Sequence, residues 1–297
     1  MASDRHIPES IARKVRQECR FGCVLCGMPI FQYDHIDEFS EAREHKVENI
    51  ALLCPNHHQE KTSRRLSKER VKNARNSPYN ANRASTAKYG LIPNEKLKIA
   101  LGSNEVTYDG SSQDHVVLWI NGTNFASIHF EGDYFTFSAV VTDASGQELL
   151  TIDRGMLAAS THVWDYQYQG RVLSIRGGPG EIIFQAEIAD QLFKILRGTF
   201  VDRHETGIIV DQAGNLSFSM SGLEVGVLSG AKFDSNATGA IAVRRESCFG
   251  EQPLPGFGFV RSWSAEYEQM ATQLRSKMEA GLQGRYPKGL KNFKPMP

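Results

Sequence analysis

Hydrophobic and polar residues alternate with a period of two across the middle of the chain, from about residue 96 to residue 245. The clearest runs are residues 116–120, 127–130, 134–141, 149–153, 172–176, 181–188, 193–201, 206–210 and 215–220. Such alternation turns one face of a segment toward a core and the other toward water, which is typical of half-buried β-strands. We therefore predict a mainly-β domain of many short strands.

Turn-forming residues separate these runs. Asn121-Gly122, Glu131-Gly132 and Ser145-Gly146 are pairs that favour hairpin turns, and Gly177-Gly178-Pro179-Gly180 is a stronger break. Short strands at regular spacing indicate a sandwich, a barrel or a β-solenoid. The pattern does not choose among these three architectures.

Helical patterns lie on both sides of this region. The run from Leu66 to Arg75 is helical in character, and a second helix is expected after Ser264, a good cap residue, with a stop at Gly281. The apolar stripe of the second helix consists of Tyr267, Met270, Ala271, Leu274 and Met278. Residues 77–95 are rich in Asn, Ser and Ala without periodicity, which is typical of a linker.

The pattern thus predicts an α+β chain in four parts. A small N-terminal module occupies residues 1–76 and the linker residues 77–95. The β-rich domain follows at residues 96–250, and residues 251–297 hold the C-terminal helix and a basic tail. A length of 297 residues is consistent with two domains.

Composition indicates the cellular location of the protein and the distribution of charge along its chain. No window has the apolar run of a membrane span, and residues 1–10 lack the apolar core of a signal peptide. We expect a cytoplasmic protein that does not enter the membrane. Residues 1–90 contain 16 Lys and Arg against 11 Asp and Glu, a balance of +5, and residues 91–297 contain 18 against 23, a balance of −5. Only the first part is therefore expected to face a polyanion.

Four of the five cysteines lie near the N-terminus. Cys23 and Cys26 form a C-x-x-C pair followed by Gly27, and Cys54-Pro-Asn-His57 provides a second pair at the same spacing. In a reducing compartment such pairs hold metal, and three cysteines with one histidine form a closed structural Zn²⁺ site. Cys19 is not needed for this site, and we interpret Cys248 as a small structural side chain.

Between the zinc pairs lie Asp34-His35 and Asn49, and His58 follows the second pair. A nuclease must take a proton from water and offset charge on the leaving oxygen; a neutral imidazole and a divalent cation serve these tasks. Asp34 is a suitable oxygen ligand for such a cation. In order and spacing, residues 15–65 resemble the zinc-stabilised HNH endonuclease family, which has the ββα-metal (His-Me finger) fold.

The resemblance implies a role for each position. His35 would be the general base, and Asp34 and His58 would hold Mg²⁺, Mn²⁺ or another divalent ion. Asn49 would fix the loop between the strands and keep the His35 ring oriented through a backbone carbonyl. His57 would complete the zinc site where many members have a cysteine. Adjacent residues at a helix start point about 100° apart, so His57 and His58 can face different sites.

Basic residues follow the motif and are candidates for contact with DNA phosphates. They are Lys61, Arg64, Arg65, Lys68, Arg70, Lys72 and, at the end of the run, Arg75. Other histidines lack metal-ligand spacing and are interpreted as structural: His45, His115, His129, His162 and His204.

These observations predict a metal-dependent endonuclease acting on double-stranded DNA, in restriction or anti-phage defence. The β-rich domain would recognise DNA, sense a small-molecule or protein activator, or build a homo-oligomer. Its acidic balance favours sensing or oligomerisation over broad DNA contact. The alternative function is a zinc-dependent DNA-binding protein without catalysis.

Overall fold

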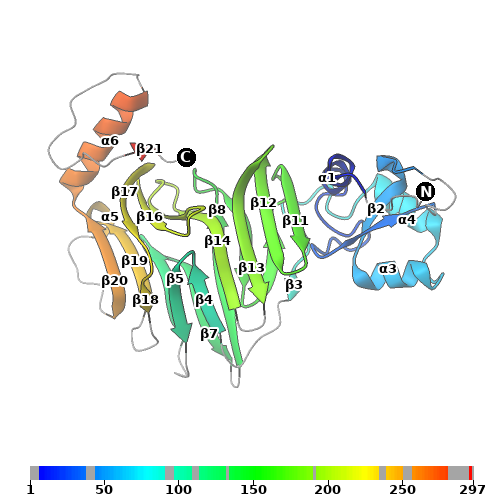
Figure 1. Cartoon of the computed structure of the whole chain (residues 1–297), viewed down its shortest axis with the longest axis horizontal. Coiled ribbons are helices and arrows are strands. Elements are labelled where there is room, and N and C mark those ends of the chain that lie inside the picture. Colours follow the sequence, from blue (N-terminus) through cyan, green and yellow to red (C-terminus); the bar gives the residue numbers. More distant parts are fainter. Residues whose placement is uncertain are drawn as a thin grey trace. The chain divides into compact units, whose positions relative to one another are not determined.

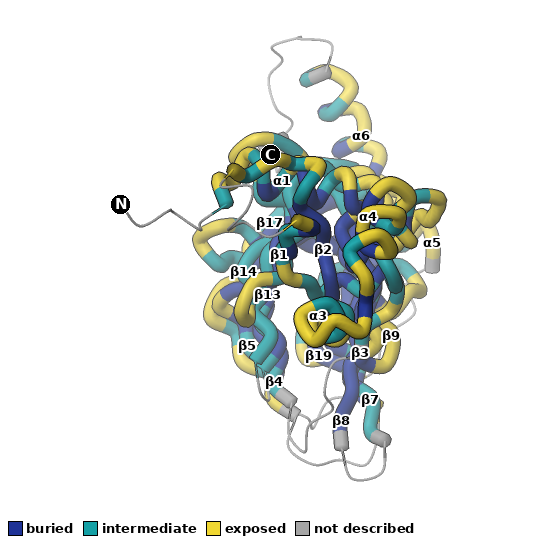
Figure 2. The backbone as a smooth tube through the Cα atoms, turned by 90° about the vertical axis from the view of Figure 1, so that its right-hand side faces the viewer, coloured by how far each residue is buried: buried dark blue, intermediate teal, exposed yellow. Residues whose placement is uncertain are grey.

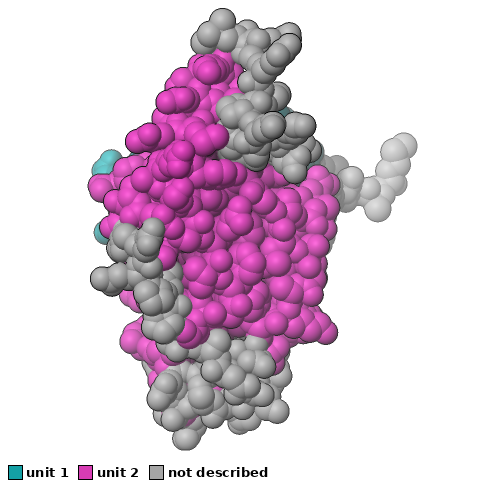
Figure 3. Space-filling view, turned by 90° about the vertical axis from the view of Figure 1, so that its left-hand side faces the viewer, with its two compact units in different colours: residues 1–91, 156–182 teal, residues 92–155, 183–297 magenta. Residues whose placement is uncertain are grey.

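The computed structural model describes residues 7–37, 44–90, 97–108, 114–131, 134–189, 192–233, 239–249, 256–279 and 294–295. The chain divides into two compact units (Figure 3). Unit 1 consists of residues 1–91 and 156–182, and unit 2 of residues 92–155 and 183–297. Within the described residues, each helix is too short or too polar to span a bilayer.

The N-terminal part of unit 1 contains a small hairpin among helices (Figure 1). Its elements are α1 (Glu9–Glu18), β1 (Gln32–His35), the 3-10 helix η1 (Val47–Asn49), β2 (Ile50–Leu53), α3 (Pro55–Thr62) and α4 (Lys68–Asn76). β1 and β2 pair antiparallel, with His35 opposite Ile50 and Gln32 opposite Leu53. The expected helical run from Leu66 to Arg75 corresponds to α4, where the Ser67 hydroxyl accepts a hydrogen bond from the Arg70 amide.

Segment 77–90 packs into unit 1, although its composition led us to expect a linker. The Asn80 side-chain amide donates to the carbonyl oxygens of Arg20 and Gly27, and Asn80 is 1% exposed. The Tyr79 amide donates to the Val24 carbonyl. Polar side chains and backbone amides of this segment therefore form hydrogen bonds with backbone groups of unit 1, which composition alone does not reveal.

Unit 1 also takes in three strands from the middle of the chain. They are β10 (Met156–Ala159), β11 (Asp165–Gln169) and β12 (Val172–Gly178). β10 pairs antiparallel with β3 (Tyr89–Gly90), and β11 pairs antiparallel with β12. The sequence predicted that residues 156–182 belong to the β-rich domain; in the structure they fall in the same compact unit as residues 1–91.

Unit 2 is mainly β. It contains β4 (Leu97–Leu101), β5 (Asn104–Tyr108), β6 (His115–Ile120), β7 (Thr123–Glu131), β8 (Tyr134–Thr142), β9 (Glu148–Asp153), most of β13 (Glu181–Ala189), β14 (Leu192–Val201), β15 (Gly207–Val210), β16 (Leu216–Met220), β17 (Leu223–Leu228), β18 (Lys232–Phe233), β19 (Gly239–Arg245), β20 (Phe257–Trp263) and β21 (Lys294–Pro295). Two helices complete it, α5 (Glu246–Phe249) and α6 (Ala265–Glu279).

Strand β14 belongs to two ladders of unit 2. Its first half, Leu192–Ile195, pairs in parallel with β4, and its second half, Gly198–Val201, pairs antiparallel with β15. Antiparallel hairpin pairs join the consecutive strands β6–β7–β8–β9 and β14–β15–β16–β17. Parallel pairs also occur, between β19 and its neighbours β6 and β20 and between β5 and β18. This pattern fits a sandwich or a barrel, and it does not fit a solenoid of stacked parallel coils.

The sequence predicted most of these strands. The alternating runs correspond to β6–β9 and β12–β16, and Ser264 caps α6 by accepting a hydrogen bond from the Tyr267 amide. The predicted break at residues 177–180 begins later, because β12 extends through Gly178 and the left-handed residue is Gly180, at φ 75°. Gly132, Gly281 and most of the basic tail lie outside the described residues.

Candidate active site

Four predicted zinc ligands meet in the N-terminal module. The ligand atoms of Cys23, Cys26, Cys54 and His57 all lie within 4.8 Å of one another. The Cys26 and Cys54 sulfurs are 3.8 Å apart, and the His57 Nδ1 atom is 3.3 Å from the sulfurs of both Cys23 and Cys54. Bonds of about 2.3 Å in a tetrahedral site place two sulfur ligands about 3.8 Å apart. The cluster therefore fits a Zn²⁺ ion.

The turn that presents Cys23 and Cys26 depends on a glycine. Gly27 has φ 75°, and its amide donates to the Cys23 carbonyl at 2.7 Å. A Cβ atom at this position would lie 2.3 Å from the Asn80 Oδ1 atom. Residue 27 therefore has to be glycine for both the backbone conformation and the close approach of Asn80.

Of the three cysteines in the cluster, Cys23 has a lowered pKa, whereas the pKa values of Cys26 and Cys54 are raised. A hydrogen bond from Cys26 lowers the pKa of the Cys23 thiol to about 5, and the same bond raises the pKa of Cys26. Cys23 is thus a thiolate at neutral pH, the form that binds metals. Cys19 is fully buried but stands apart, and burial raises its pKa to about 11.

A ββα framework holds the remaining candidates. All four residues of β2, Ile50–Leu53, are fully buried and anchor the hairpin in the module's core (Figure 2). β1 carries Asp34 and His35 opposite Ala51 and Ile50. α3 begins at Pro55, a residue that favours the first helical position because it has no amide hydrogen to satisfy.

Asp34 and His58 approach each other from β1 and α3. The Oδ1 atom of Asp34 lies 3.7 Å from the Nε2 atom of His58, and the Asp34 side chain is 11% exposed. Bonds of about 2.1 Å to one divalent ion place two of its ligands about 3 to 4 Å apart. The pair therefore fits as an oxygen and a nitrogen ligand of such an ion. His57 and His58 thus face different groups, as their adjacent positions suggested.

Lys61 belongs to this site and not to the outer surface. Its ammonium nitrogen is 2.7 Å from the Oδ2 atom of Asp34 and donates to the His35 carbonyl, and its side chain is 11% exposed. Its place in the basic run predicted contact with DNA instead. Its position one turn after His58 on α3 explains the difference, because that face of the helix turns toward β1.

Asn49 pins the loop that leaves β1. Its side-chain oxygen accepts from the Asp37 amide at 2.9 Å, and its side-chain amide donates to the Asp37 carbonyl at 3.1 Å. The Ile36 amide donates to the Asn49 carbonyl. These bonds hold the chain directly after His35.

The His35 ring contacts a residue that the sequence analysis had set aside. The Nε2 atom of His35 lies 3.1 Å from the Nδ1 atom of His45, and the ring centroids are 5.2 Å apart. Burial, followed by the charge of His45, lowers the pKa of His35 and favours its neutral form. Spacing could not reveal this pair, because a separation of ten residues matches no helix or strand period that would bring the two rings together.

The basic run divides into exposed and buried residues. Arg64, Arg65, Arg70 and Lys72 are exposed and Lys68 is partly exposed. Arg75 is 8% exposed; it donates to the Ile50 carbonyl at 2.8 Å and pairs with Glu18. The exposed residues remain candidates for phosphate contact, whereas Arg75 supports β2.

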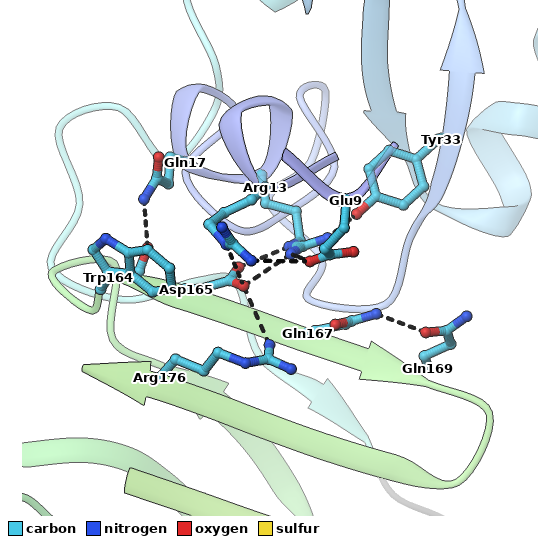
Figure 4. Close-up of polar contacts among 10 residues, drawn as sticks. Glu9, Arg13, Gln17, Tyr33, Trp164, Asp165, Gln167, Gln169 and Arg176 are labelled. Carbon is cyan, nitrogen blue, oxygen red and sulfur yellow. Dashed lines mark hydrogen bonds and ion pairs between the residues drawn. The ribbon is translucent and has the colours of Figure 1, made fainter. Parts of the chain in front are cut away.

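Behind β1, a buried ion cluster joins α1 to β11 (Figure 4). Arg16 donates from Nε and Nη2 to the two Asp165 oxygens at 2.7 and 2.8 Å, and it also donates to the Tyr33 hydroxyl on β1. The side chains of Arg16 and Asp165 are 1% and 0% exposed. Burial, the largest single effect, lowers the pKa of Arg16, but the hydrogen bonds to Asp165 and Glu9 and the charges of Tyr33 and Asp165 together outweigh it, so the pKa is raised.

Further cations surround the same carboxylate. Arg176 on β12 lies 3.2 Å and Arg13 on α1 lies 3.6 Å from an Asp165 oxygen, and Arg13 also stacks over the Trp164 ring. The Gln17 side chain donates to the Trp164 carbonyl at 2.7 Å. The hairpin β11–β12 is therefore held to α1 by charge, hydrogen bonds and a ring contact.

Comparison with known proteins identifies the N-terminal module. The model of the family described as HNH endonuclease matches residues 18–64, which span the Cys/His cluster, β1, β2 and α3. No curated protein and no solved structure matches the chain. The family match thus covers the module whose geometry is described above.

Proposed function

Since residues 18–64 form an HNH endonuclease domain, we propose that the protein is a metal-dependent endonuclease that hydrolyses phosphodiester bonds in double-stranded DNA. The observation that carries this proposal is the facing pair of Asp34 and His58 at 3.7 Å, next to His35 on β1. A carboxylate, two imidazoles and a closed zinc cluster in one small module supply the groups that metal-assisted hydrolysis needs.

In the proposed reaction, His35 acts as the general base. Its neutral imidazole takes a proton from water, and the water oxygen bonds to phosphorus while one phosphorus–oxygen ester bond breaks. The departing oxygen is protonated from solvent. Asn49 maintains the position of His35 by holding the backbone at Asp37.

Two metal sites support this chemistry. Cys23, Cys26, Cys54 and His57 would hold the structural Zn²⁺ ion and stabilise the module, which has a small core of its own. Asp34 and His58 would hold Mg²⁺, Mn²⁺ or another divalent ion, which when bound stabilises charge on the departing oxygen. Lys61 keeps the Asp34 carboxylate oriented through its contact with Oδ2.

We assign DNA contact to the exposed residues of the basic run, which lie on and beside the helices that follow the site. Phosphate contacts of this kind give affinity without sequence preference. The acidic balance of residues 91–297 leads us to assign unit 2 to sensing or oligomerisation. A nuclease whose cleavage is controlled by sensing or oligomerisation is suited to restriction or anti-phage defence. We place it in the cytoplasm, where paired cysteines stay reduced.

Plasmid cleavage by the full chain tests the proposal. We expect nicking or linearisation with Mg²⁺ or Mn²⁺ and none with EDTA. Asp34→Asn and His58→Ala should each lower the rate at least 100-fold and weaken Mn²⁺ binding measured by calorimetry in the absence of DNA. Metal-independent cleavage, or unchanged Mn²⁺ binding in both variants, would contradict the assignment of these ligands.

A further inference from the structure

The contact between His35 and His45 has a chemical consequence that depends on which nitrogen carries the hydrogen. At 3.1 Å, the Nε2 atom of His35 and the Nδ1 atom of His45 share one hydrogen. A neutral imidazole has one N–H group and one bare nitrogen. The hydrogen on this contact therefore sets which His35 nitrogen can accept a proton from water.

The surrounding loop holds His45 in place for this contact. His45 lies two residues before η1, which ends at Asn49. The oxygen and the nitrogen of the Asn49 side-chain amide both form hydrogen bonds with the Asp37 backbone. His45 is partly buried while its neighbours Glu44 and Lys46 are exposed. Residues 44–49 thus place the His45 side chain beside His35.

His45 lies outside the zinc cluster, which consists of Cys23, Cys26, Cys54 and His57. A described contact links it instead to the ring of the candidate base.

We propose that His45 is a positioning residue: its Nδ1 atom accepts the Nε2–H hydrogen of His35, so that Nδ1 of His35 carries no hydrogen and is the nitrogen that takes the proton from the attacking water. This inference rests on the proposed function, since it assigns the tautomer of the base in that reaction. The arrangement follows the general rule that a base is oriented by a third group acting on its other nitrogen. The opposite tautomer would place hydrogen on Nδ1 and block proton transfer.

Substitution of His45 tests the role by separating positioning from folding. His45→Leu removes the acceptor, and His45→Asn retains a short polar side chain whose oxygen can accept the same hydrogen. We expect His45→Leu to lower kcat about 10- to 100-fold, the usual effect of removing an orienting partner, with KM for plasmid DNA unchanged. His45→Asn should recover most of the rate. Lys46→Ala, an exposed neighbour, serves as the matched control and should behave as wild type.

Nitrogen chemical shifts of the imidazole rings give a readout that does not depend on activity. In the zinc-loaded wild-type protein, ¹⁵N-histidine labelling should show His35 with hydrogen on Nε2 and a bare Nδ1. In His45→Leu the two tautomers of His35 should become mixed. Circular dichroism and zinc content confirm that the variants are folded.

The outcomes distinguish this inference from the proposed function. If His35→Ala abolishes cleavage while His45→Leu cleaves at the wild-type rate, His45 has no positioning role and the base assignment stands. If His35→Ala itself cleaves normally, the proposed reaction is wrong. A wild-type His35 with hydrogen on Nδ1 would overturn the inference even if no variant of His45 folds.

Discussion

Removal of the buried charge of Asp165 should lower the free energy needed to open unit 1, although Asp165 lies 149 residues away from Arg16 in sequence. Asp165→Asn keeps the shape of the side chain and leaves three guanidinium groups, those of Arg13, Arg16 and Arg176, without their shared carboxylate. Arg13 and Arg16 also contact Glu9, which is half exposed. The substitution therefore leaves the Arg16 side chain, which is 1% exposed, without its buried carboxylate partner.

The size of the effect follows from this burial. Breaking a buried ion pair by removing one partner costs about 3–5 kcal/mol, because the remaining charge cannot be solvated. Since about 1.4 kcal/mol corresponds to a factor of ten, the opening of unit 1 should become about 100- to 5,000-fold more frequent. Hydrogen exchange with mass spectrometry measures this directly for amides in α1 and β1.

A matched exposed pair and a charge-free double variant complete the experiment. Glu44→Gln breaks the Lys46 pair, whose side chains are both 62% exposed, and should leave exchange unchanged. Arg16→Met combined with Asp165→Leu removes both charges and should restore part of the protection. Unchanged exchange in α1 and β1 of Asp165→Asn would refute the view that the hairpin β11–β12 is an integral part of the nuclease unit.

Two further predictions concern DNA contact and the zinc site. With zinc bound and no Mg²⁺ or Mn²⁺ added, Arg65→Ala should reduce the slope of log K against log salt for plasmid binding by about one. Lys61→Met should leave the slope unchanged, because that side chain faces Asp34; equal effects would contradict the placement of Lys61. With zinc bound, iodoacetamide should react at the exposed Cys248 and spare Cys19, whose pKa burial raises to about 11. Chelation should make Cys19 reactive as the module unfolds, and lasting protection of Cys19 would show that the module folds without metal.

Local patterns in the sequence were sufficient for the zinc cluster and for most strands. Cys23, Cys26, Cys54 and His57 come together because each pair lies in one turn, and a single hairpin brings the two pairs into contact. Period-two alternation indicates which face of a strand is buried, so the strands of unit 2 could also be predicted from local sequence. Both signals depend on residues close in sequence.

The remaining features depend on contacts between distant residues. α1 buries an arginine, Arg16, on its inner face, which gives no apolar signal, and its partner Asp165 belongs to a strand in the middle of the chain. His45 contacts His35 although their separation of ten residues follows no periodic pattern in the sequence. Lys61 was assigned to the surface because charge usually indicates exposure, whereas here it is paired with a buried carboxylate.

The most direct test of the account compares the wild-type protein with His35→Ala on supercoiled plasmid, in Mn²⁺ and at matched zinc content. We predict that the wild type nicks or linearises the plasmid, and that His35→Ala still binds DNA but cleaves at least 100-fold more slowly. Equal cleavage by the two proteins would contradict the assignment of His35 as the base. An inert wild type that binds DNA with bound Mn²⁺ would contradict the nuclease assignment itself.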